Sequence, residues 1–209
     1  MYLLRQIRIS LIVIVFTSSA VIAQSPSPDH LKTPLVPPTL QAPEGNAAFL
    51  EGHAVGTQDY ICLPSSSGFS WTFFSPQATL FTNIKAIHGD LQQQIITHFL
   101  SPNPFENGTP RATWQSSLDT SAVWGKTVAS ANDASFVAPG AIPWLLLQVV
   151  GARRGPMEGA TLTKTTFIQR LNTSGGVAPS TGCSGVSNIG STALVPYSAD
   201  YFFYTATRK

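Results

Sequence analysis

The chain has 209 residues, with 12 Lys or Arg against 10 Asp or Glu, and only 11% of all residues are charged. This near balance excludes the basic surface that nucleic-acid binding needs and the polybasic run that holds a protein to an anionic membrane. We therefore expect no nucleic-acid partner. The length suits one domain with a sizeable core.

The first segment, residues 1–23, has the pattern of a secretory signal peptide. Arg5 and Arg8 form a positive start, residues 9–16 are almost all aliphatic, and Ala23 ends a short cleavage-site pattern of small residues. An uncleaved anchor is the alternative, but the apolar run is shorter than the roughly 20 residues of a membrane span. We expect a cleaved chain with 10 basic and 10 acidic residues, with no stable membrane anchor, that is secreted or periplasmic.

The next segment, residues 24–43, holds six prolines. Proline fixes φ and lacks an amide donor, so a regular helix or strand is not expected there. We predict an extended Pro-rich tether over residues 24–43, followed by a single all-β domain over residues 44–209.

Short apolar runs and frequent chain breakers in this domain predict a β-sandwich or closed β-barrel with few or no helices. The expected strands are 56–63, 69–74, 94–100, 112–115, 122–129, 142–150, 162–171 and 197–206. Residues 142–150 and 197–206 are apolar at successive positions, so both faces of these strands are expected to be covered. One short helix is expected near residues 75–81.

The two cysteines, Cys62 and Cys183, are expected to form a disulfide, because an isolated pair in an oxidising compartment usually does. A bridge over so long a loop stabilises by roughly 4–5 kcal/mol on loop-entropy grounds. Two buried thiols or one reactive cysteine are the alternatives, and no CxxC spacing supports redox catalysis.

Several motifs of the domain resemble one secreted family of bacteria and fungi, known as domain of unknown function 3455. The motifs are residues 56–62, Trp71, 76–80, His98, Trp114, 142–147, 166–176, Ala178-Pro179, Cys183 and 195–204. The resemblance covers nearly all of the domain and implies an exported protein. Where the family has a short Gly-Pro-x-Trp turn after the histidine, this chain has a longer loop rich in Pro and Asn.

Two enzyme classes are excluded by motif. Some fungal relatives carry a malate dehydrogenase label, but the chain has no GxGxxG after a strand and no βαβ alternation. It has no GxSxG either, which excludes the nucleophile elbow of an α/β-hydrolase.

Five residues are candidate binding residues: Gln58, His98, Trp114, Arg170 and Asp200. A buried charge is costly unless it is paired, so Arg170 and Asp200 are expected to face each other. Together with Gln58 and Gln169, which also lie within apolar or aromatic strands, they would form the polar floor of a ligand pocket. Its walls would be Tyr60, Tyr201 or Trp114. The alternative is a structural ion pair, or strands with one face turned to solvent.

The sequence gives weaker support for a metal, a cofactor or a stacked sugar. No two of the four histidines show HxH or HxxxH spacing, so we expect no metal, and no motif indicates a cofactor. Trp114 and Trp124 are the candidates for stacking on a sugar. Asn107 and Asn172 lie in glycosylation sequons, which matter only in a eukaryotic host.

The sequence therefore favours a non-catalytic envelope or extracellular module that binds a small molecule or a glycan. The alternative is an extracytoplasmic enzyme whose polar site draws on His98, Arg170 and Asp200, although acid–base catalysis usually uses a denser set of titratable groups. The sequence specifies neither the ligand nor the oligomeric state.

Overall fold

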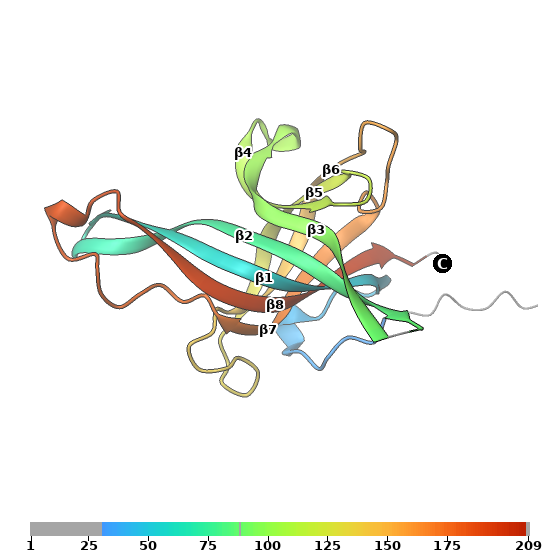
Figure 1. The fold of residues 1–209 in the computed structure, drawn as a ribbon, viewed down its shortest axis with the longest axis horizontal. Helices are drawn as coiled ribbons and strands as arrows, with labels where there is room; N and C mark the ends of the chain where they lie inside the picture. Colours follow the sequence, from blue (N-terminus) through green and yellow to red (C-terminus); the bar gives the residue numbers. More distant parts are fainter. Residues whose placement is uncertain (1–30, 88, 208–209) are drawn as a thin grey trace, which may run out of the picture.

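Eight antiparallel strands form a closed barrel in the computed structural model, which describes residues 31–87 and 89–207 (Figure 1). Each strand pairs with the next in sequence, and the last pairs with the first. The strands are β1 (Asn46–Ser65), β2 (Gly68–Ala86), β3 (Gly89–Asn103), β4 (Thr109–Ser116), β5 (Ala122–Ala131), β6 (Trp144–Arg153), β7 (Thr165–Gly175) and β8 (Thr192–Ala206). Three single-turn 3-10 helices are η1 (Pro38–Leu40), η2 (Pro104–Glu106) and η3 (Val186–Asn188). The predicted all-β class is confirmed, and the barrel is the architecture adopted.

The short helix predicted near residues 75–81 is wrong, because this segment is the middle of β2. Its Thr79 pairs with both Val55 of β1 and Thr97 of β3. The prediction treated Pro76 as a chain breaker. In the structure Pro76 lies opposite Gln58, close to a bulge at Phe74 of the same strand where the ladder is already interrupted, and a proline is tolerated at such a point.

Alternation along the strands divides the apolar residues between two clusters. The inner cluster fills part of the barrel, and the outer cluster lies against its wall. Leu147 and Phe203 belong to the inner cluster, whereas their neighbours Leu146 and Phe202 belong to the outer one. β6 and β8 therefore bury apolar side chains on both faces, which confirms the prediction made for residues 142–150 and 197–206.

The N-terminal chain helps to cover the outer cluster. Leu40 is fully buried there, and its carbonyl accepts a hydrogen bond from Nε2 of Gln169 at 2.6 Å. The amide of Leu31 bonds the carbonyl of Ala48 at 3.3 Å. The signal peptide and the first part of the predicted tether lie outside the described residues, but from residue 31 onward the Pro-rich chain packs on the barrel.

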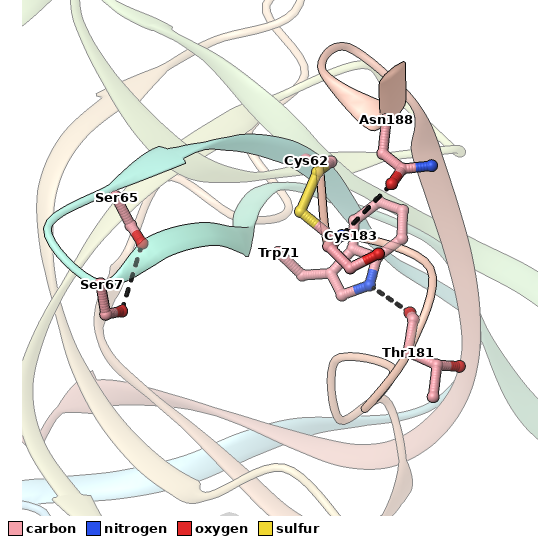
Figure 2. The surroundings of a disulfide bond; sticks show 8 residues. Cys62, Ser65, Ser67, Trp71, Thr181, Cys183 and Asn188 are labelled. Atoms are coloured by element: carbon pink, nitrogen blue, oxygen red, sulfur yellow. Dashed lines mark hydrogen bonds between the residues drawn. A yellow bond between two sulfur atoms is a disulfide. The ribbon is translucent and has the colours of Figure 1, made fainter. Parts of the chain in front are cut away.

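The disulfide between Cys62 and Cys183 is confirmed, with the two Cα atoms 5.5 Å apart. It joins β1 to the connection between β7 and β8 (Figure 2). Beside it, Nε1 of Trp71 donates to the carbonyl of Thr181 at 2.8 Å, which fastens β2 to the same connection. A disulfide of this kind indicates an oxidising, extracytoplasmic compartment. In the described part of the chain, no helix has the length and hydropathy to cross a bilayer.

Candidate ligand-binding cavity

A cavity of about 380 Å³ lies inside the barrel, and every strand contributes to its lining. Its apolar wall includes Phe73, Leu100, Trp114, Leu145 and Leu147. Its polar lining includes Gln58, His98, Arg170 and Tyr201. Four of the five predicted binding residues therefore meet at one cavity.

His98 and Trp114 meet because they are cross-strand partners in β3 and β4. Their rings are stacked, with centroids 4.3 Å apart and planes 10° from parallel, and Tyr201 packs edge-on against both. Gly125 leaves room for the indole, since a Cβ there would lie 2.8 Å from Trp114. The long loop between the two strands leaves this pairing intact, because both strands continue in register as far as Asn103.

The protonation state of His98 follows from its surroundings. Burial, and to a lesser extent the charge of Arg170, lowers the pKa of His98 to about 3, although the hydrogen bond to the carbonyl of Thr113 acts in the opposite direction. The ring is therefore neutral at physiological pH. Since a carbonyl can only accept, Nδ1 at 2.9 Å from the oxygen of Thr113 carries the proton, and Nε2 is left as an acceptor.

Two buried donors at the cavity have no hydrogen-bond partner among the described residues: Nε2 of Gln58 and Nε1 of Trp114. The two side chains belong to residues that are only 3% and 1% exposed. A buried donor without a partner costs roughly 1–3 kcal/mol, so such groups are uncommon unless another molecule satisfies them. A third unpartnered donor, Nε1 of Trp144, belongs to the outer cluster.

The prediction that Arg170 and Asp200 face each other is wrong. Asp200 pairs with Leu171 in the β7–β8 ladder, and Arg170 pairs with Tyr201. This offset of one residue places the two side chains on opposite faces of the barrel wall. Asp200 lies outside, where it bonds Nδ1 of His53 at 2.6 Å and Nδ2 of Asn172 at 2.8 Å.

Arg170 points inward and is half-buried. It donates from Nη2 and Nε to the carbonyl of Pro143, at 2.9 and 3.3 Å. Within residues 31–87 and 89–207 it forms no ion pair with a carboxylate. A guanidinium at the cavity thus keeps its positive charge uncompensated by the protein.

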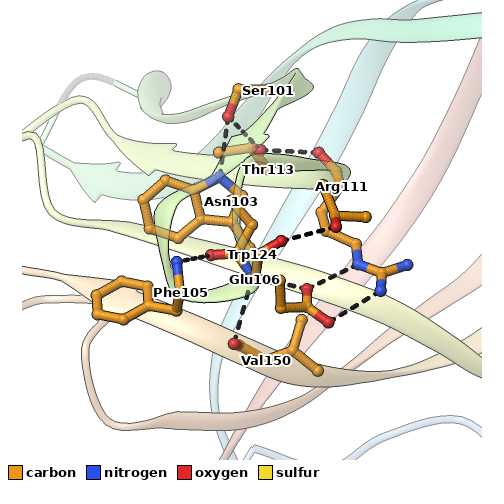
Figure 3. Close-up of polar contacts among 9 residues, drawn as sticks. Ser101, Asn103, Phe105, Glu106, Arg111, Thr113, Trp124 and Val150 are labelled. Carbon is orange, nitrogen blue, oxygen red and sulfur yellow. Dashed lines mark hydrogen bonds and ion pairs between the residues drawn. The ribbon is translucent and has the colours of Figure 1, made fainter.

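The rim of the cavity carries two further cations, Arg111 and Lys126. Arg111 makes a two-pronged ion pair with Glu106, at 2.8 and 2.9 Å (Figure 3). Hydrogen bonds from Arg111 and then Asn103 lower the pKa of Glu106 to about 2, so the pair stays charged at neutral pH. Neither cation was predicted from the sequence. The β5–β6 pairing shifts register on either side of Lys126, so simple alternation does not place that side chain.

Neither candidate sugar-stacking residue offers an exposed face. Trp114 is 1% exposed and Trp124 is 3% exposed. The indole of Trp124 is fixed by a hydrogen bond to Oγ of Ser101 at 2.9 Å, beside the Asn103 and Glu106 contacts (Figure 3). A ligand therefore meets Trp114 only by entering the cavity.

One cluster on the outer face has the donor types of a metal site. Single ligand atoms of Glu51, His53 and Asp200 lie within 4.8 Å of one another. Two of these residues already bond each other, and Asn172 bonds the second oxygen of Asp200. The cluster lies on the opposite side of the wall from the cavity.

Fold and site together define a disulfide-bonded, eight-stranded antiparallel barrel with an internal cavity lined by cationic, aromatic and apolar groups. The chain belongs to the family described as "Protein of unknown function (DUF3455)", which matches residues 43–205. No curated protein and no solved structure matches the chain.

Proposed function

We propose that the protein is a non-catalytic binding module that works outside the cytoplasm and takes one small molecule into its barrel. Residues 1–23 would serve as its signal peptide, which gives a secreted or periplasmic protein. The disulfide between Cys62 and Cys183 supports an oxidising compartment.

The observation that carries this proposal is the pair of buried, unpartnered donors at the cavity, on Gln58 and Trp114. A ligand whose acceptor atoms reached these donors would satisfy them and recover the cost of their burial. By analogy of fold alone, eight-stranded barrels are wide enough to hold one small ligand.

The alternative of an enzyme using His98, Arg170 and Asp200 has less support. Catalysis requires the acid and base groups to converge on one reacting position. His98 and Arg170 share the cavity, but Asp200 is bonded to His53 on the outer face. Binding without chemistry is therefore the function that the geometry supports best.

The proposal is tested by ligand-observed NMR on the purified protein with a diverse library of small molecules. Ala112 lines the cavity, so Ala112→Phe fills it, whereas Leu194→Phe adds bulk at a residue 63% exposed on β8. We expect several library members to bind the unchanged protein and Leu194→Phe, and to lose binding in Ala112→Phe.

Binding that survives in Ala112→Phe would contradict the proposal, and so would a library without any binder. If thermal melting shows that Ala112→Phe is unfolded, Thr127→Trp replaces it. Thr127 is exposed at the mouth of the cavity, where a bulky side chain blocks entry without disturbing packed neighbours.

A further inference from the structure

We infer that the ligand is a small organic carboxylate whose anionic group binds Arg170 and whose apolar body lies against Trp114 and Leu145. The inference rests on the proposed function and specifies the ligand class of the same cavity. It is carried by the charge, the free donors and the apolar wall of this cavity.

The charge of the cavity has one sign. In the described part of the chain, Arg111, Lys126 and Arg170 line it, and no Asp or Glu does. Glu106 neutralises Arg111, and Lys126 is exposed at the rim, where water screens its charge. Arg170 therefore remains as the charge that a bound ligand would meet inside the barrel, and one negative charge balances it.

The free donors of Arg170 suit a carboxylate. A guanidinium has five N–H groups in one plane, and the carbonyl of Pro143 takes only Nε and one hydrogen of Nη2. The remaining N–H groups can hold two oxygen atoms in the paired geometry that arginine makes with carboxylates. Tyr201 is the ladder partner of Arg170 and lines the same cavity, so its hydroxyl group belongs to the polar surroundings of the guanidinium.

The other contacts restrict the rest of the ligand. Phe73, Leu100, Trp114 and Leu145 offer apolar or aromatic surface, so the body of the ligand is expected to be apolar. A volume of about 380 Å³ accommodates on the order of ten non-hydrogen atoms at roughly 30 Å³ each. This size fits an aromatic acid or a medium-chain fatty acid.

A phosphate ester would bind arginine with the same oxyanion chemistry, but it carries close to two negative charges at neutral pH. Among the residues that the structure describes, Arg170 is the one unpaired cation inside the barrel, so part of that charge would be buried without compensation. The observations therefore favour a monocarboxylate, and phenyl phosphate becomes an arm of the test.

The test compares 3-phenylpropionate, 3-phenylpropanamide and phenyl phosphate by isothermal titration calorimetry on the unchanged protein. The acid and the amide have the same shape and differ in charge. We expect the acid to bind at least tenfold more tightly than the amide and more tightly than phenyl phosphate. Equal binding of acid and amide would overturn the inference, and tighter binding of the phosphate would replace the carboxylate with a phosphate ester.

Arg170→Gln is expected to weaken acid binding at least tenfold and to leave amide binding within about twofold. Arg154→Gln is the matched control, because Arg154 is exposed and pairs with Glu158 away from the cavity. Retention of the acid preference in Arg170→Gln would contradict the role of this residue. The acid–amide comparison on the unchanged protein decides the inference even if Arg170→Gln does not fold.

Failure of this inference differs from failure of the proposed function. If library members bind in the cavity but charge has no effect on affinity, the binding function stands and the carboxylate assignment falls. If nothing binds and the acid also fails, both fall together.

Discussion

The outer cluster and the internal cavity each hold one buried glutamine, and the two side chains differ in their hydrogen bonding. Gln169, in the outer cluster region, donates to the carbonyl of Leu40 at 2.6 Å and accepts from the hydroxyl of Tyr204 at 2.5 Å. Gln58, at the cavity, has an Nε2 without any partner in the described chain. Their exposures are nearly equal, 1% and 3%, so burial alone does not explain the difference.

The two regions differ in whether the protein itself supplies the hydrogen-bond partners of its buried polar groups. In the outer region the N-terminal chain supplies the missing hydrogen-bond partner, and the protein satisfies itself. Inside the cavity, no residue between 31 and 87 or between 89 and 207 bonds the donors of Gln58 and Trp114 or pairs with the charge of Arg170. We therefore expect substitutions in packed regions to change stability, and substitutions at the cavity to change binding.

The largest expected effect comes from the filled part of the barrel. Phe203 is fully buried in the inner cluster, so Phe203→Ala is expected to reduce the free energy of unfolding by about 3–5 kcal/mol. Phe73 is 48% exposed at the cavity, and Phe73→Ala is expected to cost no more than about 1 kcal/mol. Urea unfolding measures both, and equal losses would contradict the distinction between the two regions.

Substitution of the two buried glutamines is expected to change the free energy of unfolding by a smaller amount. The comparison is better matched, because the same residue type is replaced at two similarly buried positions. Gln169→Leu leaves the carbonyl of Leu40 and the hydroxyl of Tyr204 unpartnered, which is expected to cost about 2–4 kcal/mol. Gln58→Leu removes a donor that has no partner of hydrogen-bond geometry in the described chain, although its side chain lies near the hydroxyl of Tyr197. That hydroxyl keeps the hydroxyl of Tyr201 as a neighbour at 3.4 Å. The free energy of unfolding is then expected to stay within about 1 kcal/mol or to rise.

Chemical denaturation of the two leucine variants in parallel checks this prediction. If Gln58→Leu proves as destabilising as Gln169→Leu, then Nε2 of Gln58 is satisfied in the folded protein. The cavity would then offer a ligand one free side-chain donor of this kind, on Trp114, in place of two.

The third prediction concerns pH. The folded-state pKa of His98, about 3, lies below the unfolded value of 6.5, so the unfolded chain binds the proton first as pH falls. The stabilisation is fully present above pH 6.5 and is lost progressively toward pH 3, by up to about 1.4 kcal/mol per pH unit. Between pH 6.5 and 4.5 the loss amounts to about 2–3 kcal/mol.

His98→Gln isolates this contribution, since all other titrating groups are the same in both proteins. We expect the free energy of unfolding of the variant to depend less steeply on pH over this window. If the free energy of unfolding changes equally steeply with pH in the two proteins, then His98 is protonated in the folded state or its ring is open to water.

Much of the local structure was predictable from sequence. The segment 142–150 was recognised as a strand covered on both faces, because its apolar residues occupy both sides of the alternation. The pairing of Cys62 with Cys183 was predictable because the chain has only these two cysteines. The helix near residues 75–81 failed because a proline beside a bulge looks, in sequence, like a chain break.

The candidate site was predictable only in part. The candidates Gln58, His98, Trp114 and Arg170 all line the cavity. Gln169 and Asp200 were expected in the polar floor as well, but neither lines it: Gln169 bonds Leu40 in the outer region and Asp200 bonds His53. Whether a strand residue faces in or out depends on its register against its neighbours, which composition does not encode.

The strand-rich domain and the two residues that form its covalent cross-link follow from the amino-acid sequence, because both depend on local pattern and composition. The closure of the sheet into a barrel, and the inward direction of Arg170 against the outward direction of Asp200, follow from the three-dimensional pairing of the strands. Closure and register depend on pairings between strands far apart in the chain, including the β1–β8 pairing that joins residues 46 and 206. A pairing at that distance is fixed by the whole set of strands together, and no single segment specifies it.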